Sequence, residues 1–413
     1  MLFSKNKNLS ELIIYIILFL LPFYDLTFSG IKLFEIFFVI LIVVDVFQGV
    51  KVFDFKFLIF FMLLFGALIR SFIILYFNFQ QWNVSLVLYK VYEYPYIWNT
   101  FVFIQLIVIF YLLKRAKSVN FDINYINKIY LLILIIELSL SLYQILFLKN
   151  QFPSGTMTEK GPLGTYAVGI TFFYDLLYSD KLCSKSDYMK ISILSFFLLA
   201  LTISGRGYIL YLIWKFSLLF FSSRIKSLFK KIAGLSALII IFYYFSNYIF
   251  FKIQTYSAFL TNSSLVSRAI GRYAAPIIVS RVLKTNPLFG LGFSNYSFIK
   301  SSEKYGFLMI QIGRDYSNNI FMSLIVDSGI VGMILIILFT FLYFKRDFLS
   351  MNKNNFWPVM IFLFFNANVA VINDYIFWSL ILYIMIYISL KKHKIASNGR
   401  ESNEINVIEK QGH

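Results

Sequence analysis

Arginine side chains gather in two stretches of an otherwise strongly apolar chain. Arg206 stands in LTISGRGYILYLIWK (201–215), between two apolar runs. Arg268 and Arg272 come later and are four residues apart, so on a helix they project from one face. A planar guanidinium group binds phosphate oxygens through two parallel hydrogen bonds. These residues therefore predict a site for an anionic ligand that carries phosphate.

The elements that must position these arginines are membrane-spanning helices. Of the 413 residues, 59% are hydrophobic and 14% are charged, whereas a soluble domain is about 45–50% apolar and about 25% charged. We expect an all-α polytopic membrane protein with about 12 transmembrane helices. The predicted ranges are 11–29, 32–49, 57–77, 96–113, 129–148, 163–179, 189–204, 207–222, 232–251, 319–343, 356–373 and 375–390.

The charges between these ranges predict the orientation. With a cytoplasmic N-terminus, the inside gaps hold 21 membrane-proximal lysines and arginines, and the short outside gaps hold five. This imbalance follows the positive-inside rule and places both termini in the cytoplasm. The net charge of +18 is then a consequence of topology and does not indicate nucleic-acid binding. Residues 1–390 form a single transmembrane domain, and 391–413 are predicted to be a disordered cytoplasmic tail.

This orientation puts Arg206 in a tight hairpin on the extracytoplasmic side, where the neighbouring glycines would let the chain reverse direction. The one large loop, 252–318, lies on the same side and carries a net charge of +6. A helix-like stretch within it, about 264–283, closes at Thr285-Asn286-Pro287. Two simpler interpretations stay open: Arg206 reaches lipid phosphates, and the loop rests on anionic lipids.

Histidine and cysteine usage excludes several classes of chemistry. Cys183 is the only cysteine, so there is no disulfide framework and no thiolate metal site. The two histidines, His393 and His413, lie in the C-terminal tail, which argues against a membrane acyltransferase with a histidine base. No Asp-x-Asp motif occurs on the outside, so we predict that the protein needs neither a metal nor a cofactor.

Four segments resemble a known family. TISGRGYILYLI (202–213) resembles the serine–arginine–glycine hairpin of the O-antigen polymerase and O-antigen ligase superfamily of bacterial envelope proteins. KTNPLFGLGFSNYSFI (284–299) is similar to an element of that family's large periplasmic loop, and SNNIFMSLIVDSGIVGMILII (317–337) to the segment that closes the loop. GTMTEKGPLGTYAVGI (155–170) is a weaker match to a shorter outer loop. The segments occur in the family's order.

The resemblance implies glycosyl transfer at the outer face of the bacterial cytoplasmic membrane. A polymerase would move a growing glycan from polyprenyl pyrophosphate to the non-reducing end of a lipid-linked repeat unit. A ligase would move it to lipid A-core or another terminal acceptor. Ligases carry a histidine where this chain has Asn318, which favours a polymerase. The implied partners are the lipid-linked oligosaccharide, membrane lipids, a chain-length regulator and a flippase.

The predicted site combines cations with a few polar groups. Because the pyrophosphate leaving group develops negative charge, cations that stabilise it contribute most to the reaction. The predicted diphosphate clamp is Arg206 with Arg268, and the further candidate ligands are Arg272, Arg281, Arg314, Asn318 and Asn319. Asp315 is the candidate general base, ahead of Glu303 and Glu159.

A lipid-linked oligosaccharide flippase is the rival from another class, since it would also have about a dozen helices. A flippase built from repeats would show two similar halves, and the sequence has no internal repeat. Several ionisable residues also fall within predicted spans, where we expect them to pair or to line a cavity, with Lys215 in an internal ion pair. They are Asp45, Arg70, Glu137, Asp175, Lys215 and Asp327.

Overall fold

The structure is a computed structural model of the chain. It describes residues 9–23, 27–28, 31–50, 54–78, 95–150, 153–157, 160–221, 276–292, 295, 299, 319–367 and 375–411. The ninth predicted span, 232–251, and most of the predicted large loop lie outside the described residues.

The described residues form helices and one very short β-hairpin. In the hairpin, β1 (Thr27–Phe28) pairs antiparallel with β2 (Ile31–Lys32), and Thr27 lies opposite Lys32. The helices before the long gap in the description are α1 (Leu9–Leu20), the 3₁₀ helix η1 (Leu21–Phe23), α2 (Leu33–Phe47), α3 (Phe55–Asn78), α4 (Pro95–Ala116), α5 (Ile123–Leu146), α6 (Lys160–Ser179), α7 (Lys185–Thr202) and α8 (Gly205–Phe221). After it come α12 (Ile320–Leu349), α13 (Lys353–Ala367) and α14 (Tyr375–Gln411).

These helices coincide with the predicted spans wherever the structure describes them. One clear difference is at the first range, which was predicted to be 11–29. Its helix ends at Leu20 and the 3₁₀ turn ends at Phe23. Pro22 lies in that turn, has no N–H group to donate and disfavours helical backbone in the residue before it. Hydropathy alone does not register this stop, because the following residues are also largely apolar.

Five helices within the described chain are long and apolar enough to cross a membrane. They are Phe55–Asn78, Asn99–Ala116, Ile123–Leu146, Ile320–Leu349 and Tyr375–Ile395. Helix α3 also exposes large apolar side chains at helical spacing, including Met62, Phe65, Ile69 and Ile73. Water would disfavour such a face, whereas lipid would cover it.

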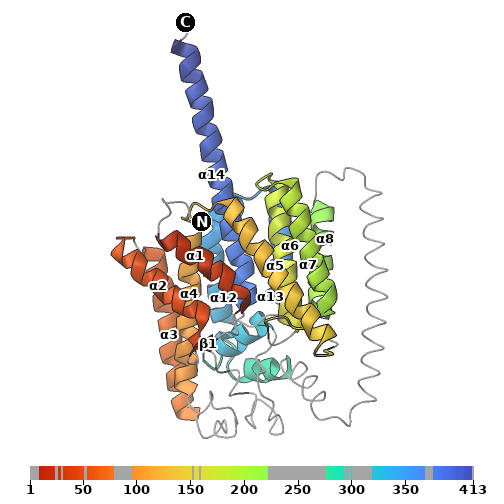
Figure 1. Ribbon diagram of the computed structural model, residues 1–413. Coiled ribbons are helices and arrows are strands. Elements are labelled where there is room, and N and C mark those ends of the chain that lie inside the picture. The colour runs from red at the N-terminus through yellow and green to blue at the C-terminus, as the bar shows by residue number, and fades with distance from the viewer. Residues whose placement is uncertain are drawn as a thin grey trace.

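The helices run roughly side by side as a bundle (Figure 1). Helices α2, α3 and α4 form one side of it and α6, α7 and α8 the other, with α12, α13 and α14 between them. Helix α14 contacts both α4 and α6. The apolar window of α14 is 83% buried, whereas that of α12 is only 22% buried. Helix α14 is therefore the central element against which the two sides pack.

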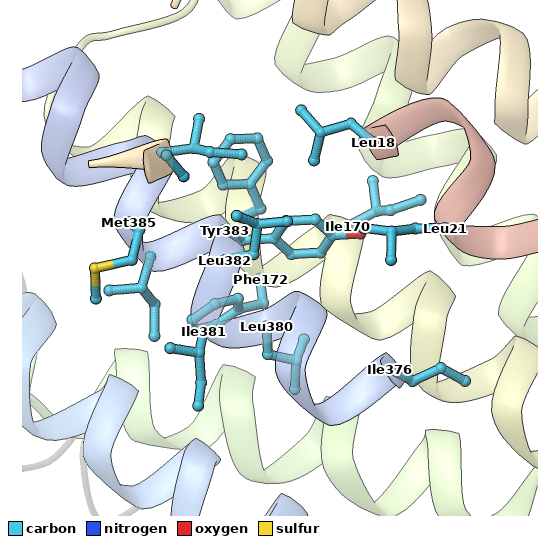
Figure 2. Close-up of a cluster of buried hydrophobic side chains, with 14 of the residues drawn as sticks. Leu18, Leu21, Ile170, Phe172, Ile376, Leu380, Ile381, Leu382, Tyr383 and Met385 are labelled. Carbon is cyan, nitrogen blue, oxygen red and sulfur yellow. The ribbon is translucent and has the colours of Figure 1, made fainter. Parts of the chain in front are cut away.

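Close packing of large side chains holds this centre together. Figure 2 shows Leu18 of α1, Leu21 of η1, Ile170 of α6 and Tyr383 of α14 in one buried cluster. The Tyr383 ring also lies edge-on to Tyr130 of α5, with centroids 5.7 Å apart. Because lipid tails are as apolar as these side chains, van der Waals packing rather than removal from water favours their association.

The C-terminal residues differ from their prediction. Residues 391–413 were expected to be disordered, but α14 continues to Gln411 and projects beyond the bundle (Figure 1). Extending an existing helix adds one hydrogen bond per residue without a new nucleation cost. A polar segment that would be a poor helix alone can therefore extend one that is already packed in the bundle.

Candidate anion-binding site

The turn between α7 and α8 carries Arg206. Helix α7 ends with Ile203 in the left-handed region at φ 47°. Ser204 then caps α8, because its Oγ accepts a hydrogen bond from the Gly207 N–H at 3.1 Å. A β-branched residue rarely adopts positive φ, and such strain concentrates at functional sites. The turn thus fixes Arg206 in the first turn of α8.

Gly207 of this hairpin serves close packing, whereas chain reversal was the role predicted for the hairpin glycines. The positive φ falls on Ile203, not on a glycine. A Cβ atom at Gly207 would lie 3.0 Å from the backbone of Gly164 in α6. One at Gly164 would lie 2.5 Å from the Ser204 side chain. Helices α6 and α8 therefore meet almost backbone to backbone, directly beneath Arg206.

Asn366 of α13 is the neighbour that orients Arg206. The partly buried guanidinium donates from Nη2 to the Asn366 Oδ1 at 3.4 Å. Asn366 is fully buried, and its Nδ2 has no hydrogen-bond partner in the described part of the chain. An unsatisfied buried donor costs about 1–3 kcal/mol. Beside a guanidinium group, such a donor is suited to an oxygen atom of an anionic ligand.

The start of α12 lies next to this pair. Phe321 of α12 and Phe364 of α13 have ring centroids 5.6 Å apart, so the 317–337 segment approaches the end of α13 that carries Asn366. Asn319, a predicted ligand, caps α12 by accepting from the Met322 N–H at 3.0 Å. Parts of three segments that are distant in sequence, 155–170, 202–213 and 317–337, therefore converge around the α7–α8 turn.

The fourth segment, 284–299, joins a break in α12. At Gly329 the backbone has φ 67° and ψ −172°, which interrupts the helix. Residues 287–292 supply the missing partners through four backbone hydrogen bonds of 2.7–3.1 Å. The pairs are Leu291–Val326, Gly292–Asp327, Ile330–Pro287 and Val331–Leu288. A Cβ atom at Gly329 would lie 2.4 Å from the Leu288 carbonyl group, so only glycine allows this approach.

Arg70 of α3 stabilises the same segment. Its guanidinium group donates to the carbonyl oxygens of Phe289 and Gly290, the latter at 2.9 Å. These two carbonyl oxygens therefore take the place of a carboxylate partner. Asn99 of α4 adds a second anchor, because it donates to Asn295 at 2.9 Å. The arginine predicted to pair within a span thus binds backbone instead.

The turn 153–157 is fixed onto α5 by two side chains. Gln144 Oε1 accepts from the N–H groups of Ser154 and Gly155 at 2.8 and 3.0 Å. Glu137, which is fully buried, accepts from both the N–H and the hydroxyl of Thr156. These contacts explain a charged residue inside α5 and hold the loop that leads into α6.

A second polar cluster surrounds Glu35, a residue that the sequence interpretation did not single out. Glu35 Oε1 accepts from Gln105 Nε2 at 3.0 Å and from the Tyr375 hydroxyl at 2.5 Å. Its Oε2 accepts from the Lys32 N–H at 3.2 Å. Helices α2, α4 and α14 contribute to this cluster. A glutamate in an apolar helix was the only signal available, and its partners are uncharged.

The predicted site residues are described only in part. Arg206 and Asn319 lie in the converging region given above. Arg281 is partly buried within the helical residues 276–285, which stop before Pro287 as predicted. Arg268, Arg272, Arg314, Asp315 and Asn318 lie outside the described residues. The predicted meeting of Arg206 with Arg268 therefore stays a prediction.

The opposite end of the bundle, from which α14 projects, has a different electrostatic character. There aspartates pair with lysines and arginines of neighbouring helices. The pairs are Arg115–Asp45, Lys114–Asp54, Lys117–Asp347, Lys392–Asp347 and Lys391–Asp180. We call this region the ion-pair end. The predicted internal ion pair of Lys215 is confirmed, with Asp175 at 2.6 Å.

Neither metal ligation nor sequence similarity adds to this geometry. The described residues contain no group of three or more histidine, cysteine, aspartate or glutamate side chains that could hold a metal ion. The sequence matches no known protein-family model and no curated protein. The family resemblance of the four segments therefore remains a prediction.

Proposed function

We propose that this chain is a membrane glycosyltransferase, a polysaccharide polymerase that uses a polyprenyl-pyrophosphate-linked donor. The observation that carries the proposal is the pairing of Arg206 with Asn366. Arg206 offers a guanidinium group from the α7–α8 turn, and Asn366 of α13 offers an amide donor that has no partner among the described residues. This donor set suits phosphate oxygens. The convergence of the family-like segments around it supports the same function.

In the proposed reaction, the acceptor hydroxyl attacks the anomeric carbon of the donor glycan. The bond from that carbon to phosphate breaks, and the lipid diphosphate leaves with the electron pair. Arg206 stabilises the negative charge that develops on the diphosphate, and we assign Arg268 to the same clamp. Arg272, Arg281, Arg314 and Asn318 are further candidate ligands, with Asp315 as the loop candidate for the base.

Asn319 is best assigned a positioning role. Its side-chain oxygen accepts the hydrogen bond from the Met322 N–H that caps α12. By fixing the first turn of α12, the cap holds that helix against α13 and thus close to Asn366.

The proposal places the protein in the bacterial cytoplasmic membrane, with both termini in the cytoplasm. The cation-rich ion-pair end would face the cytoplasm, in keeping with the positive-inside rule. The Arg206 region would then face outward, where lipid-linked repeat units are joined. A chain-length regulator and a flippase would be its functional partners, and a ligase-type transfer is the alternative within the same chemistry.

A flippase is the second candidate function, and one observation favours it. Helix α12 is interrupted at Gly329, and transporters often use such broken helices at their substrate sites. The free backbone groups at this break, however, bind residues 287–292. They are therefore not available to a substrate or an ion, which favours the polymerase.

The test is deletion of the gene, followed by electrophoresis of surface glycans and of lipid-linked intermediates. We expect single repeat units on lipid and no long chains, with length restored by the wild-type gene. Arg206→Ala should fail to restore long chains although it inserts normally. Arg346→Ala is the matched control, because Arg346 is exposed near the ion-pair end and loses the same charge.

Each other outcome has a distinct meaning. Unattached lipid-linked polymer in the deletion strain would identify a ligase. Accumulation of repeat units on the cytoplasmic face would identify a flippase. Normal chain-length ladders with Arg206→Ala would overturn the site assignment.

A further inference from the structure

The Glu35 cluster has hydrogen-bonding capacity that no donor among the described residues uses. A carboxylate has about four lone-pair positions. Glu35 Oε1 accepts two hydrogen bonds, from Gln105 and Tyr375, but Oε2 accepts only one, from the backbone of Lys32. The Glu35 side chain is partly exposed. One carboxylate oxygen is thus able to accept a further proton donor from outside the protein.

Gln105 provides a second unused acceptor at the same place. Its Nε2 must face the Glu35 carboxylate, because the opposite orientation would place two oxygens together. This fixes Oε1 on the other side of the amide. Gln105 is 6% exposed, and Oε1 is buried without a partner in the described residues. Within the described residues, the Gln105 carbonyl oxygen thus has no donor, and the Glu35 carboxylate beside it has room for one more.

The charge next to the cluster indicates which kind of ligand could donate hydrogen bonds to Glu35 and Gln105. The Lys32 ammonium group lies 4.7 Å from the centroid of the Tyr375 ring. The hydroxyl of the same tyrosine donates to Glu35. A cation bound at Glu35 would be repelled by this nearby charge. Neutral hydroxyl groups, one for each acceptor, would bind here without repulsion. The cluster is therefore complementary to a polyhydroxylated compound such as a sugar.

The cluster also complements the Arg206 region chemically. Arg206 and Asn366 offer donors, whereas Glu35 and Gln105 offer acceptors. Tyr375 begins α14 and follows Asn366 of α13 by nine residues, so both groups flank the connection between those helices. A transferase needs both kinds of site, one for the leaving diphosphate and one for the attacking hydroxyl.

We infer that Glu35 binds the attacking hydroxyl group of the acceptor sugar and accepts its proton, and that Gln105 binds a second hydroxyl group of the same sugar. This inference rests on the proposed function. As the hydroxyl oxygen bonds to the anomeric carbon, its proton passes to the Glu35 carboxylate. The carbon–phosphate oxygen bond breaks, and the lipid diphosphate leaves with the electron pair. Glu35 then releases the proton to water.

Two assays on purified protein test the inference separately from the proposed function. Farnesyl diphosphate, a short lipid diphosphate without sugar, probes the Arg206 region by direct binding. Lipid-linked repeat units extracted from the deletion strain probe transfer. Glu35→Gln should lower kcat by about 10²–10⁴-fold, the usual contribution of a general base. Its affinity for farnesyl diphosphate should stay within about twofold of wild type, whereas Arg206→Ala should lose that affinity.

A conservative variant adds a readout that a structural role would not change. Glu35→Asp keeps a carboxylate at the same position of α2. It should therefore restore part of the kcat that Glu35→Gln loses, without a matching change in KM.

Control variants separate chemistry from support of the fold. Tyr375→Phe removes the hydrogen bond to Glu35 but keeps the carboxylate, so it should lower kcat far less than Glu35→Gln. Gln105→Leu should mainly raise KM for the repeat unit, and it provides the test if Glu35→Gln does not fold. Equal losses in Tyr375→Phe and Glu35→Gln, or wild-type transfer by Glu35→Gln or Gln105→Leu, would overturn the inference. Unchanged farnesyl diphosphate binding by Arg206→Ala would instead overturn the proposed function.

Discussion

The two ends of the bundle use charged residues in opposite ways. At the ion-pair end, each buried aspartate meets at least one cation from another helix, as Asp347 meets both Lys117 and Lys392. At the other end, which we call the arginine–amide end, Arg206 contacts Asn366 and Glu35 contacts Gln105. Within the part of the chain that the structure describes, the Asn366 nitrogen and the Gln105 oxygen have no hydrogen-bond partner.

This difference suggests that one end of the bundle stabilises the fold and that the other binds a ligand. A buried ion pair satisfies its charges internally and leaves nothing for a ligand. An amide that bonds to an ion uses one of its two polar atoms and keeps the other. The ion-pair end should therefore hold the helices together, whereas the arginine–amide end should hold a substrate.

The largest expected effect comes from removing a cation at the ion-pair end. The Asp45 side chain is fully buried and lies 3.0 Å from Arg115. Arg115→Met leaves that carboxylate unpaired and should lower the free energy of unfolding by about 3–5 kcal/mol. Arg206→Met should lower it by less, about 1 kcal/mol, because the Asn366 side chain that Arg206 contacts is a neutral amide. Denaturant titration in detergent measures both, and equal losses would remove the contrast between the ends.

Asn366→Asp makes the arginine–amide end resemble the other end. The new carboxylate would neutralise Arg206 and repel an anionic ligand. We expect transfer activity to fall by about 10²–10³-fold, similar to the loss of one transition-state donor. Unfolding should need as much denaturant as for wild type or more. Asn352→Asp, an exposed position near the ion-pair end, is the control. Retained activity in Asn366→Asp would contradict ligand binding at Arg206.

Gly164→Ala tests whether the turn beneath Arg206 depends on close helix packing. The added Cβ would lie 2.5 Å from the Ser204 side chain. Such overpacking should lower the free energy of unfolding by about 1–3 kcal/mol and reduce activity by displacing the turn. Gly161→Ala, one turn earlier in α6, meets nothing within 4 Å and should be neutral or stabilising by up to about 1 kcal/mol. Identical effects of the two variants would exclude this packing role.

The smallest expected change in the free energy of unfolding comes from Asp54, an exposed residue of the ion-pair end. Burial tends to raise the pKa of Asp54, but hydrogen bonds from the Phe57 N–H and Lys114 outweigh it and lower the pKa below its ordinary value of 3.8. A lowered pKa stabilises the fold above that ordinary value, and this stability is lost as the pH falls through the lowered pKa. Because Asn also caps a helix, Asp54→Asn should cost only about 0.2–1 kcal/mol at pH 6. Unfolding measured from pH 6 to pH 3 should show the difference shrinking, and a difference that grows would contradict this assignment.

Sequence patterns located the helices well but not the contacts between them. Apolar runs report which residues avoid water, so they placed α3 to α8 and α12 to α14. Charge complementarity also predicted the pairing of Lys215 with an acid inside the bundle. The end of the first helix at Pro22 and the continuation of α14 beyond residue 391 were missed, because composition says little about where a helix stops.

The candidate site shows more clearly which contacts a sequence cannot predict. Arg206 stands out because an arginine in an apolar context is rare. Asn366 and Gln105 carry no charge and no spacing pattern, so nothing in the sequence separates them from other buried amides. Their importance depends on which polar atom their neighbours occupy, and only tertiary structure determines that. Arg70 was noticed, but its carbonyl partners could not be inferred from charge.

The interruption of α12 also restricts how the chain length can vary. Four backbone pairs join residues 287–292 to the two sides of Gly329. Adding or deleting a single residue between Pro287 and Gly292 would put these pairs out of register and leave polar backbone groups exposed to hydrocarbon or buried alone. Short insertions there should abolish assembly of the protein, although hydropathy alone would class the segment as an ordinary loop.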